Sequence, residues 1–354
     1  MTAKHTLILS LSLLGLSIPA VADKPELLTF EGKEGPAAGK HIVFMAGDEE
    51  YRSEETCPMM AKILSQRLGF KCTVLFSMSE DGSYIDPNNQ KSMPGAETLD
   101  SADLLIIGTR FRQLDDEGYG KLAGFLNAGK PVIGFRTATH AFRGDGKTGD
   151  FAWAQFGPNI LGEGWVNHHG GHGSQGALGV VEEANKDHAI LNGVSEVFGP
   201  SDVYGIRKVT PENSTILLRG AVTESLDAAS KPIEGAKNDP MMPLAWLREY
   251  TAPDGKTKGR AFCTTLGASV DFEDTGLRRM VVNASLFLLG IPVPEEVDVS
   301  YVDPFEASSF GFIKDKEFFK GRNLKPGDFA LGKSAATGLP EGRAGLKGYK
   351  RGKE

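Results

Sequence analysis

The densest group of chemically active side chains is a glycine-rich segment, residues 164–173, which carries His168, His169 and His172. Glycine lets ring and backbone groups approach a ligand closely, and imidazole can transfer protons or coordinate a divalent metal. The H-H-x-x-H spacing matches no common zinc motif, and adjacent histidines on an extended segment point in opposite directions. Three interpretations stay open: a proton-transfer or ligand-binding loop, a divalent metal site, and a plain polar loop.

A second polar group, Glu49, Glu50, Tyr51 and Arg52, follows a short apolar run and Gly47. Carboxylates at the start of a helix lie at the positive end of its dipole, where they can accept ligand hydroxyl groups or act as a base. Acids also occur there simply to cap the helix. Three acids and a tyrosine, counting Asp48, exceed what capping requires.

A third group follows another apolar run: residues 134–140 contain Arg136, Thr137 and His140. A strand that turns sharply into a helix carries the nucleophile of several α/β enzymes. Here Arg136 occupies the apex of the turn, so we expect no covalent catalysis by serine or cysteine. His140 could act as acid or base, or be a structural histidine.

Two further polar positions, Asp202 and Tyr204, stand two residues apart and face the same way on an extended segment. An acid beside a phenol suits hydroxyl recognition or acid–base work, and a structural hydrogen bond is the alternative. Asp187 and His188 are more simply explained as a local turn.

Alternating apolar runs and amphipathic segments predict the elements that must position these loops. Strands are expected at 41–46, 72–76, 103–108 and 131–135, with helices near 60–68 and 122–126 between them, and residues 77–99 form a long polar connection. Further strands are expected at 176–181, 216–218, 243–247 and 260–266, and a last helix at 277–287. This alternation predicts one α/β domain over 40–290, with a doubly wound, mainly parallel sheet and helices on both faces. In such a sheet, ligands bind beyond the carboxyl ends of the strands, where the loops after the first and fourth strands should meet.

The segments outside this domain differ in composition. Lys4, the apolar stretch 7–16 and Ala20-Val21-Ala22 predict a signal peptide cut after Ala22, and hence a periplasmic or secreted protein; an uncleaved anchor is the alternative. Residues 23–39 are an N-terminal extension. Residues 291–331 contain prolines and aromatics and are expected to pack on the domain as an arm. Residues 332–354 are glycine-rich and basic and are expected to be disordered.

Charge and cysteine content exclude several classes of partner. Without Lys4 the chain has 38 basic and 46 acidic residues, a net charge of −8, which argues against nucleic acid and anionic membranes. After signal cleavage no segment is long and apolar enough to span a membrane. The three cysteines, Cys57, Cys72 and Cys263, have no CxxC spacing; Cys72 and Cys263 lie in apolar runs and are expected in the core, and one disulfide stays possible.

Taken together and in this order, several segments resemble the trehalose-utilisation (ThuA-like) domain family over about residues 40–290. The segments are residues 47–53, 134–142, 164–172, 187–193, 202–204, 243–246, 259–262 and 265–267. The resemblance implies a fold similar to class I glutamine amidotransferases with a flavodoxin-like core, a link to carbohydrate utilisation, and keto sugars or disaccharides as substrates. Amidotransferases carry cysteine where this chain has Arg136, so glutaminase chemistry is not expected. Many family members have histidine near this turn apex, whereas this chain has His140 four residues later.

The sequence therefore predicts a carbohydrate-handling protein with acid–base chemistry on a keto sugar. The expected catalytic residues are Glu50, His140, His168 and His172. The expected substrate-binding residues are Glu49, Tyr51, Arg52, Arg136, Thr137, Trp165, His169, Asp202 and Tyr204. A non-catalytic sugar-binding module, with Trp153 or Trp165 stacked on a ring, and a metal-dependent hydrolase built on the histidines are the alternatives. The partner is a small-molecule carbohydrate, and self-association into a homo-oligomer stays open.

Overall fold

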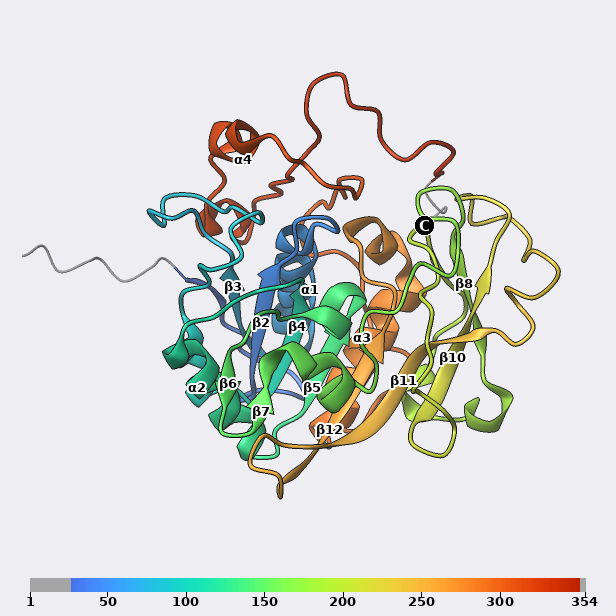
Figure 1. The fold of residues 1–354 in the computed structure, drawn as a ribbon, viewed down its shortest axis with the longest axis horizontal. Helices are drawn as coiled ribbons and strands as arrows, with labels where there is room; N and C mark the ends of the chain where they lie inside the picture. Colours follow the sequence, from blue (N-terminus) through green and yellow to red (C-terminus); the bar gives the residue numbers. More distant parts are fainter. Residues whose placement is uncertain (1–26, 351–354) are drawn as a thin grey trace, which may run out of the picture.

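The computed structural model describes residues 27–350 and centres on a ten-stranded sheet with the order β1-β3-β2-β4-β5-β12-β11-β10-β8-β9 (Figure 1). Its strands are β1 Leu28–Phe30, β2 His41–Gly47, β3 Lys71–Phe76, β4 Leu104–Thr109, β5 Val132–Phe135, β8 Ala177–Val181, β9 Val197–Gly199, β10 Thr215–Val222, β11 Met242–Thr251 and β12 Lys258–Thr264. A small hairpin, β6 Lys147–Thr148 and β7 Phe151–Ala152, lies outside the sheet.

Five central strands form the parallel core of the sheet. Strand β2 pairs in parallel with β3 and β4, β4 with β5, and β5 with β12. Numbered along the chain, these strands lie in the order 2-1-3-4-5, which is the flavodoxin-like order. Every residue of β2, β4 and β5 is buried, as expected for strands covered on both faces. The expected doubly wound α/β core is confirmed.

The sheet is mixed because antiparallel strands extend it at both edges. Strand β1 pairs antiparallel with β3, and β11, β10, β8 and β9 continue from β12 in antiparallel pairs. The sequence predicts all of these strands except β1 and β9, but it does not predict their direction. Direction depends on pairing partners that lie far apart in the chain.

Helices cover both faces of the sheet, as predicted. Helices α1 Ser53–Leu68 and α3 Thr275–Leu288 contribute to one buried apolar cluster, and α2 Asp116–Asn127 contributes to the other. Helix α1 ends where Gly69 adopts a left-handed conformation, φ 86°, and donates its N–H to Ser65 O. The short helical segments are η1 Ala96–Asp100, η2 Arg136–His140, η3 Trp153–Gln155, η4 Gly157–Leu161, η5 Glu183–Asn185, η6 Ala189–Leu191, η7 Ser269–Glu273 and η8 Pro326–Phe329.

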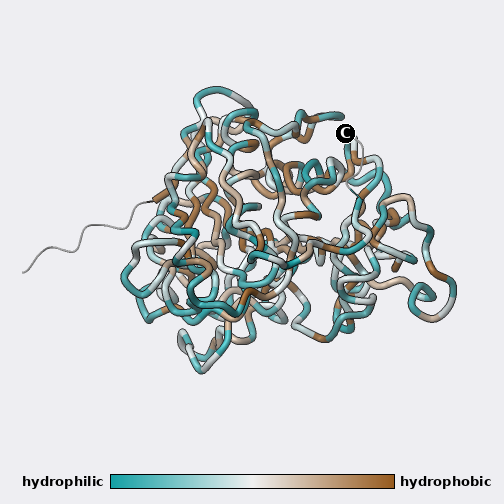
Figure 2. The backbone as a smooth tube through the Cα atoms, turned by 90° about the horizontal axis from the view of Figure 1, so that it is seen from above, coloured by the Kyte–Doolittle hydropathy of each residue, from teal (hydrophilic) through white to brown (hydrophobic). Residues whose placement is uncertain are grey.

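The chain after α3 crosses the edge of the sheet at the top of Figure 1, and we call residues 291–350 the C-terminal arm. It includes α4 Lys316–Arg322, and Phe329 stacks on Phe76 with ring centroids 5.8 Å apart. In a view from above, most outer loops are hydrophilic (Figure 2).

Residues 332–350 differ from the expected disordered tail, because they contact the domain. Thr337 is buried; its N–H donates to Glu55 Oε1 at 2.7 Å and its hydroxyl donates to Glu54 Oε1 at 2.7 Å. Glu55 also accepts from Ser308 N at 2.9 Å and Ser269 Oγ at 2.6 Å. These hydrogen bonds to buried carboxylates help to hold a segment that has few large apolar side chains, and apolar content alone does not reveal them. Residues 351–354 lie outside the described part of the chain.

Other sequence expectations concern the cysteines and the N-terminus. Cys57, Cys72 and Cys263 are all buried free thiols, so no disulfide joins them. Within residues 27–350 no helix has the length and hydropathy of a membrane span. The predicted signal peptide, residues 1–22, lies outside the described residues.

We expect Glu55→Ala to destabilise the protein by several kcal/mol, because each of three donors loses a buried acceptor at about 1–3 kcal/mol. Denaturant unfolding measures this change, and limited proteolysis should show faster cleavage within residues 332–350. Glu317→Ala, at an exposed position on α4, is the control and should change neither readout. If the Glu55→Ala protein unfolds at the same denaturant concentration as the wild type and is cleaved at the same rate, this carboxylate does not hold the arm on the domain.

Candidate active site

A cavity of about 480 Å³ lies at the carboxyl ends of β2, β4 and β5. Its lining residues are Glu50, Arg110, Phe111, His140, Trp165, His168, His172, Tyr204, Gly311, Phe312 and Arg343. This volume is in the range of small-molecule sites, and the position is the one expected for an α/β sheet. Another cavity, of about 440 Å³ beside the start of α3, is lined by Glu196, Glu273 and Asp274 among others and by no imidazole.

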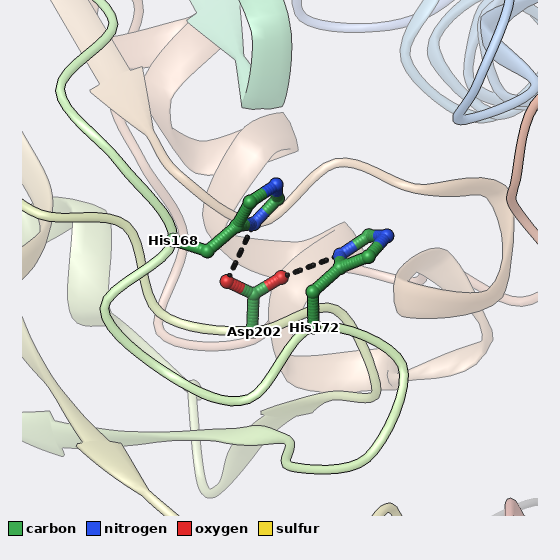
Figure 3. A group of neighbouring side chains, drawn as sticks. All are labelled: His168, His172 and Asp202. Atoms are coloured by element: carbon green, nitrogen blue, oxygen red, sulfur yellow. Dashed lines mark hydrogen bonds and ion pairs between the residues drawn. The ribbon is translucent and has the colours of Figure 1, made fainter.

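At the floor of the cavity, two histidines of one loop contact the same buried carboxylate (Figure 3). His168 Nδ1 lies 2.8 Å from Asp202 Oδ2, and His172 Nδ1 lies 3.0 Å from Asp202 Oδ1. Burial would raise the pKa of Asp202, but the Arg136 guanidinium and the two histidines outweigh it, so the pKa falls below its ordinary value. An ionised carboxylate only accepts hydrogen bonds, so both Nδ1 atoms donate to it. Their Nε2 atoms point away from Asp202, as Figure 3 shows.

Beneath Asp202 lies Arg136, the residue at the apex of the turn after β5. Its φ is +49°, a left-handed conformation that is unusual for a side-chain-bearing residue. The guanidinium donates from Nη2 to Asp202 Oδ1 at 2.9 Å and from Nη1 to Asp202 O at 2.6 Å and Thr265 O at 3.0 Å. It is sandwiched between the rings of Tyr204, at 3.9 Å, and Tyr51, at 4.5 Å. A charge buried this fully requires such partners.

The acids after β2 have different positions. Glu49 is held by Arg110 Nη1 at 2.5 Å and Arg112 Nη2 at 2.6 Å, behind the cavity surface. Glu50 faces the cavity, and its Oε1 lies 3.3 Å from His172 Nε2. The loop is held in shape by Asp48, which accepts from Glu50 N at 2.7 Å and from the Thr137 hydroxyl.

Two imidazoles of the cavity have pKa values shifted in opposite directions. Hydrogen bonds with Asp202 and Glu50 raise the pKa of His172 to about 9. Burial, with the Arg110 and Arg136 cations nearby, lowers the pKa of His140 to about 3. At neutral pH His172 is therefore a cation and His140 is neutral, and groups driven apart in this way suit separate roles in acid–base chemistry.

The structure brings together six of the residues proposed from the sequence at the cavity surface: Glu50, His140, Trp165, His168, His172 and Tyr204. Others lie behind it and position their neighbours: Glu49, Tyr51, Arg52, Arg136, Thr137 and Asp202 are all buried. Of these, Arg136 and Asp202 were expected to hold ligand hydroxyls. In the structure the guanidinium donates to Asp202 and Thr265, and the carboxylate accepts from Arg136 and the two histidines. His169 points elsewhere, with its Nε2 2.8 Å from Lys237 O.

Sequence reasoning missed Arg110, Phe111, Phe312 and Arg343 among the lining residues. Arg110 and Phe111 directly follow β4, so the rule that loops after parallel strands meet could have found them. Phe312 and Arg343 belong to the C-terminal arm, and no local pattern connects them to this edge of the sheet.

His168, His172 and Asp202 offer nitrogen and oxygen atoms within 4.8 Å of one another, a set that could in principle hold a divalent cation. A cation at the centre of the set would displace both imidazole hydrogen bonds and stand beside Arg136, whose Nη2 is 2.9 Å from the same carboxylate. The arrangement fits a carboxylate that orients imidazoles better than a metal centre.

Comparison with known proteins places this site within a recognised domain. Residues 42–288 match the family model for trehalose utilisation, ThuA. A ThuA-like protein from Parabacteroides merdae is 13% identical, with a TM-score of 0.48, over 73% of this chain and 92% of its own. A ThuA-like protein from Bacteroides uniformis is also 13% identical, with a TM-score of 0.45, over 73% and 95% of the two chains. No curated protein matches the chain.

We expect Asp202→Asn to destabilise the fold by about 3–5 kcal/mol, because it leaves the Arg136 charge buried without its counter-ion. Denaturant unfolding at pH 7 measures the loss. Asp187→Asn, at an exposed position on the surface, is the matched control and should unfold like the wild type. A stable Asp202→Asn protein would show that the pair does not hold these loops.

We expect the stabilising contribution of His172 to depend on pH. Its folded-state pKa, about 9, lies above the ordinary value of 6.5, so the contribution is complete below pH 6.5 and is lost as pH rises through 9. The difference in melting temperature between wild type and His172→Gln should therefore be largest below pH 6.5 and shrink towards pH 10. His169→Gln, which removes an imidazole from the same loop, is the control. A difference that grows with pH would refute the charged state of His172.

Proposed function

Because the chain belongs to the trehalose-utilisation (ThuA) family, we propose that it is a carbohydrate-handling protein that performs acid–base chemistry on a keto sugar or keto-disaccharide. The observation that carries this proposal is the pair of imidazoles oriented by Asp202 at the floor of the cavity, with Glu50 beside one of them. A general base, a general acid and a fixed orienting carboxylate are the groups that such chemistry requires.

The roles follow from charge and position. Glu50 and His168 face the cavity and are the proposed bases. His172, a cation at neutral pH, is the proposed proton donor and partner of a developing oxyanion. Asp202 and Arg136 keep the imidazoles in place, and neither is proposed to contact the sugar.

A keto group makes the proposed chemistry accessible, because the carbonyl acidifies the adjacent C–H bond. The base removes this proton, and the electron pair of the C–H bond becomes a C=C bond while the carbonyl oxygen becomes an enolate oxygen, next to His172. In an isomerisation, the enolate oxygen takes a proton from the acid to give an enediol. The hydroxyl of the α-carbon then loses its proton and becomes the new carbonyl, while a proton is added to the former carbonyl carbon. In a β-elimination, the bond to the β-substituent oxygen breaks instead, and that oxygen takes a proton from the acid. Neither route needs an added oxidant or reductant.

Aromatic rings around the cavity suit the apolar face of a sugar ring. Trp165 is 40% exposed, and its ring lies 5.0 Å from His140 and 4.9 Å from His168. Phe111 and Phe312 also line the cavity. An exposed tryptophan beside polar groups that can bind hydroxyls is a common arrangement in small-molecule sites.

We also propose export to the periplasm or beyond. This proposal depends on the sequence of residues 1–22, and N-terminal sequencing of the protein purified from the cells that make it tests it. A start at Asp23 supports cleavage, and a start at Met1 or Thr2 opposes it.

The test of the catalytic proposal is turnover of a keto-disaccharide, followed by chromatography of the products. We expect Glu50→Gln and His168→Gln to lower the rate by about 100-fold or more, the usual contribution of a proton-transfer group. His169→Gln, whose side chain points away from the cavity, should keep the wild-type rate.

Each other outcome of this assay favours an alternative. Calorimetric binding without turnover would indicate a sugar-binding module. Loss of turnover with a chelator, restored by a divalent metal, would indicate a metal-dependent hydrolase. Undiminished turnover in both variants would remove these residues from the mechanism.

A further inference from the structure

One wall of the cavity comes from the C-terminal arm, outside the region that matches the family. Gly311, Phe312 and Arg343 line the cavity, whereas the family match ends at residue 288. The family domain supplies the histidines, Glu50 and Trp165. The arm is therefore an addition that belongs to this chain and closes one side of a site built by the common domain.

The arm is anchored directly to the catalytic loops. Gly311 N donates to Glu50 O at 2.8 Å, and Gly311 O accepts from Arg52 Nη2 at 2.6 Å. The ring of Phe310 lies 5.3 Å from those of both Tyr51 and His172. Arg52 has an unusual left-handed backbone conformation, φ 63°. Its buried guanidinium contacts the arm at Gly311 O.

Phe312 and Arg343 then form the outer part of the wall. Arg343 Nη1 donates to Phe312 O at 2.6 Å. Phe312 is 39% exposed, and its ring lies 4.9 Å from the Arg110 guanidinium, which also stacks on Phe111 at 4.6 Å. The arm and the loop after β4 are thus joined at the cavity through a cation between two aromatic rings.

Among the cations of the described cavity lining, Arg343 alone has no carboxylate partner. Arg110 pairs with Glu49, and His172 contacts the carboxylates of Glu50 and Asp202. No carboxylate of residues 27–350 forms an ion pair with Arg343. Arg343 is exposed and uses one of its five N–H donors on Phe312, so its remaining donors are open to a ligand.

We propose that the substrate is an anionic sugar, with a carboxylate or sulfate group, and that Arg343 is the residue of the arm that selects it. This inference rests on the proposed function of the same cavity and names its substrate class. The guanidinium presents a planar pair of N–H groups that matches carboxylate and sulfate oxygens. Phe312 and Trp165 bind the apolar face of the ring, while the anionic substituent lies towards Arg343.

The test is calorimetric binding of matched neutral and anionic sugars to the full-length protein. The pairs are methyl β-glucoside against methyl β-glucuronide, and glucose against glucose 6-sulfate. We expect at least one anion to bind about tenfold tighter than its neutral partner, as a charge-assisted hydrogen bond provides. The preference should weaken from 20 to 200 mM NaCl, because the guanidinium is exposed.

Substitutions test whether Arg343 causes the preference for the anionic sugar. Arg343→Gln should lose the preference for the anion and bind the neutral sugar as the wild type does. Arg343→Lys should keep part of it, since the charge stays but the paired N–H groups are lost. Lys347→Gln, an exposed charge on the same arm that does not line the cavity, is the control and should bind both sugars unchanged.

The outcomes separate this inference from the proposed function. Equal or tighter binding of the neutral sugars to the wild type overturns the inference, even when a neutral keto-disaccharide is turned over. Equal weakening of both sugars in Arg343→Gln also overturns it, because Arg343 would then only shape the wall. Anion preference without turnover supports the inference and contradicts the catalytic proposal. Binding of none of the four sugars overturns the inference, and a keto-disaccharide turnover assay then decides the proposed function separately.

Discussion

The buried ion pair between Arg136 and Asp202 is the interaction on which the geometry of the site depends. The two side chains are 1% and 0% exposed, and neither charge could stay buried without the other. Arg136 follows β5, Asp202 follows β9, and the carboxylate also holds both histidines of a third loop. One pair of charges therefore fixes three loops that are far apart in the sequence, and it sets which nitrogen of each imidazole faces the cavity.

The turn after β5 places a strained backbone position beneath the cavity. The left-handed conformation at Arg136 costs about 1–2 kcal/mol for a residue with a side chain. Hydrogen bonds to Asp202, Thr265 and Tyr51 and the two aromatic rings offset that cost. The strained turn here directs a guanidinium inward as a support, and the groups suited to proton transfer lie on the histidine loop above it.

The site is also a composite of the family domain and the chain that follows it. The buried acids Glu54 and Glu55, at the start of α1, hold the arm by its backbone and by the hydroxyl of Thr337. The same helix begins directly after Glu50 and Arg52, which contact Gly311. A single helix N-terminus thus connects the loop that carries Glu50, the arm and the Arg343 charge at the edge of the cavity.

Local patterns are enough to predict the α/β core, most of its strands, and the acidic and histidine loops, because burial periodicity and residue type are local properties. The rule that loops after parallel strands meet at one edge of the sheet brings Glu50 and His140 together, but it does not place the histidine loop, which follows a short helical segment and precedes the antiparallel strand β8. Which polar side chains line the cavity depends on the whole fold: Arg136 and Asp202 are buried and pair with each other, and His169 contacts Lys237 O, because burial and pairing depend on partners far apart in the chain. No local pattern predicts that Phe312 and Arg343 reach the cavity, since an irregular segment carries no periodic signal and its place is fixed by contacts with distant residues, among them Glu55, Arg52 and Phe76.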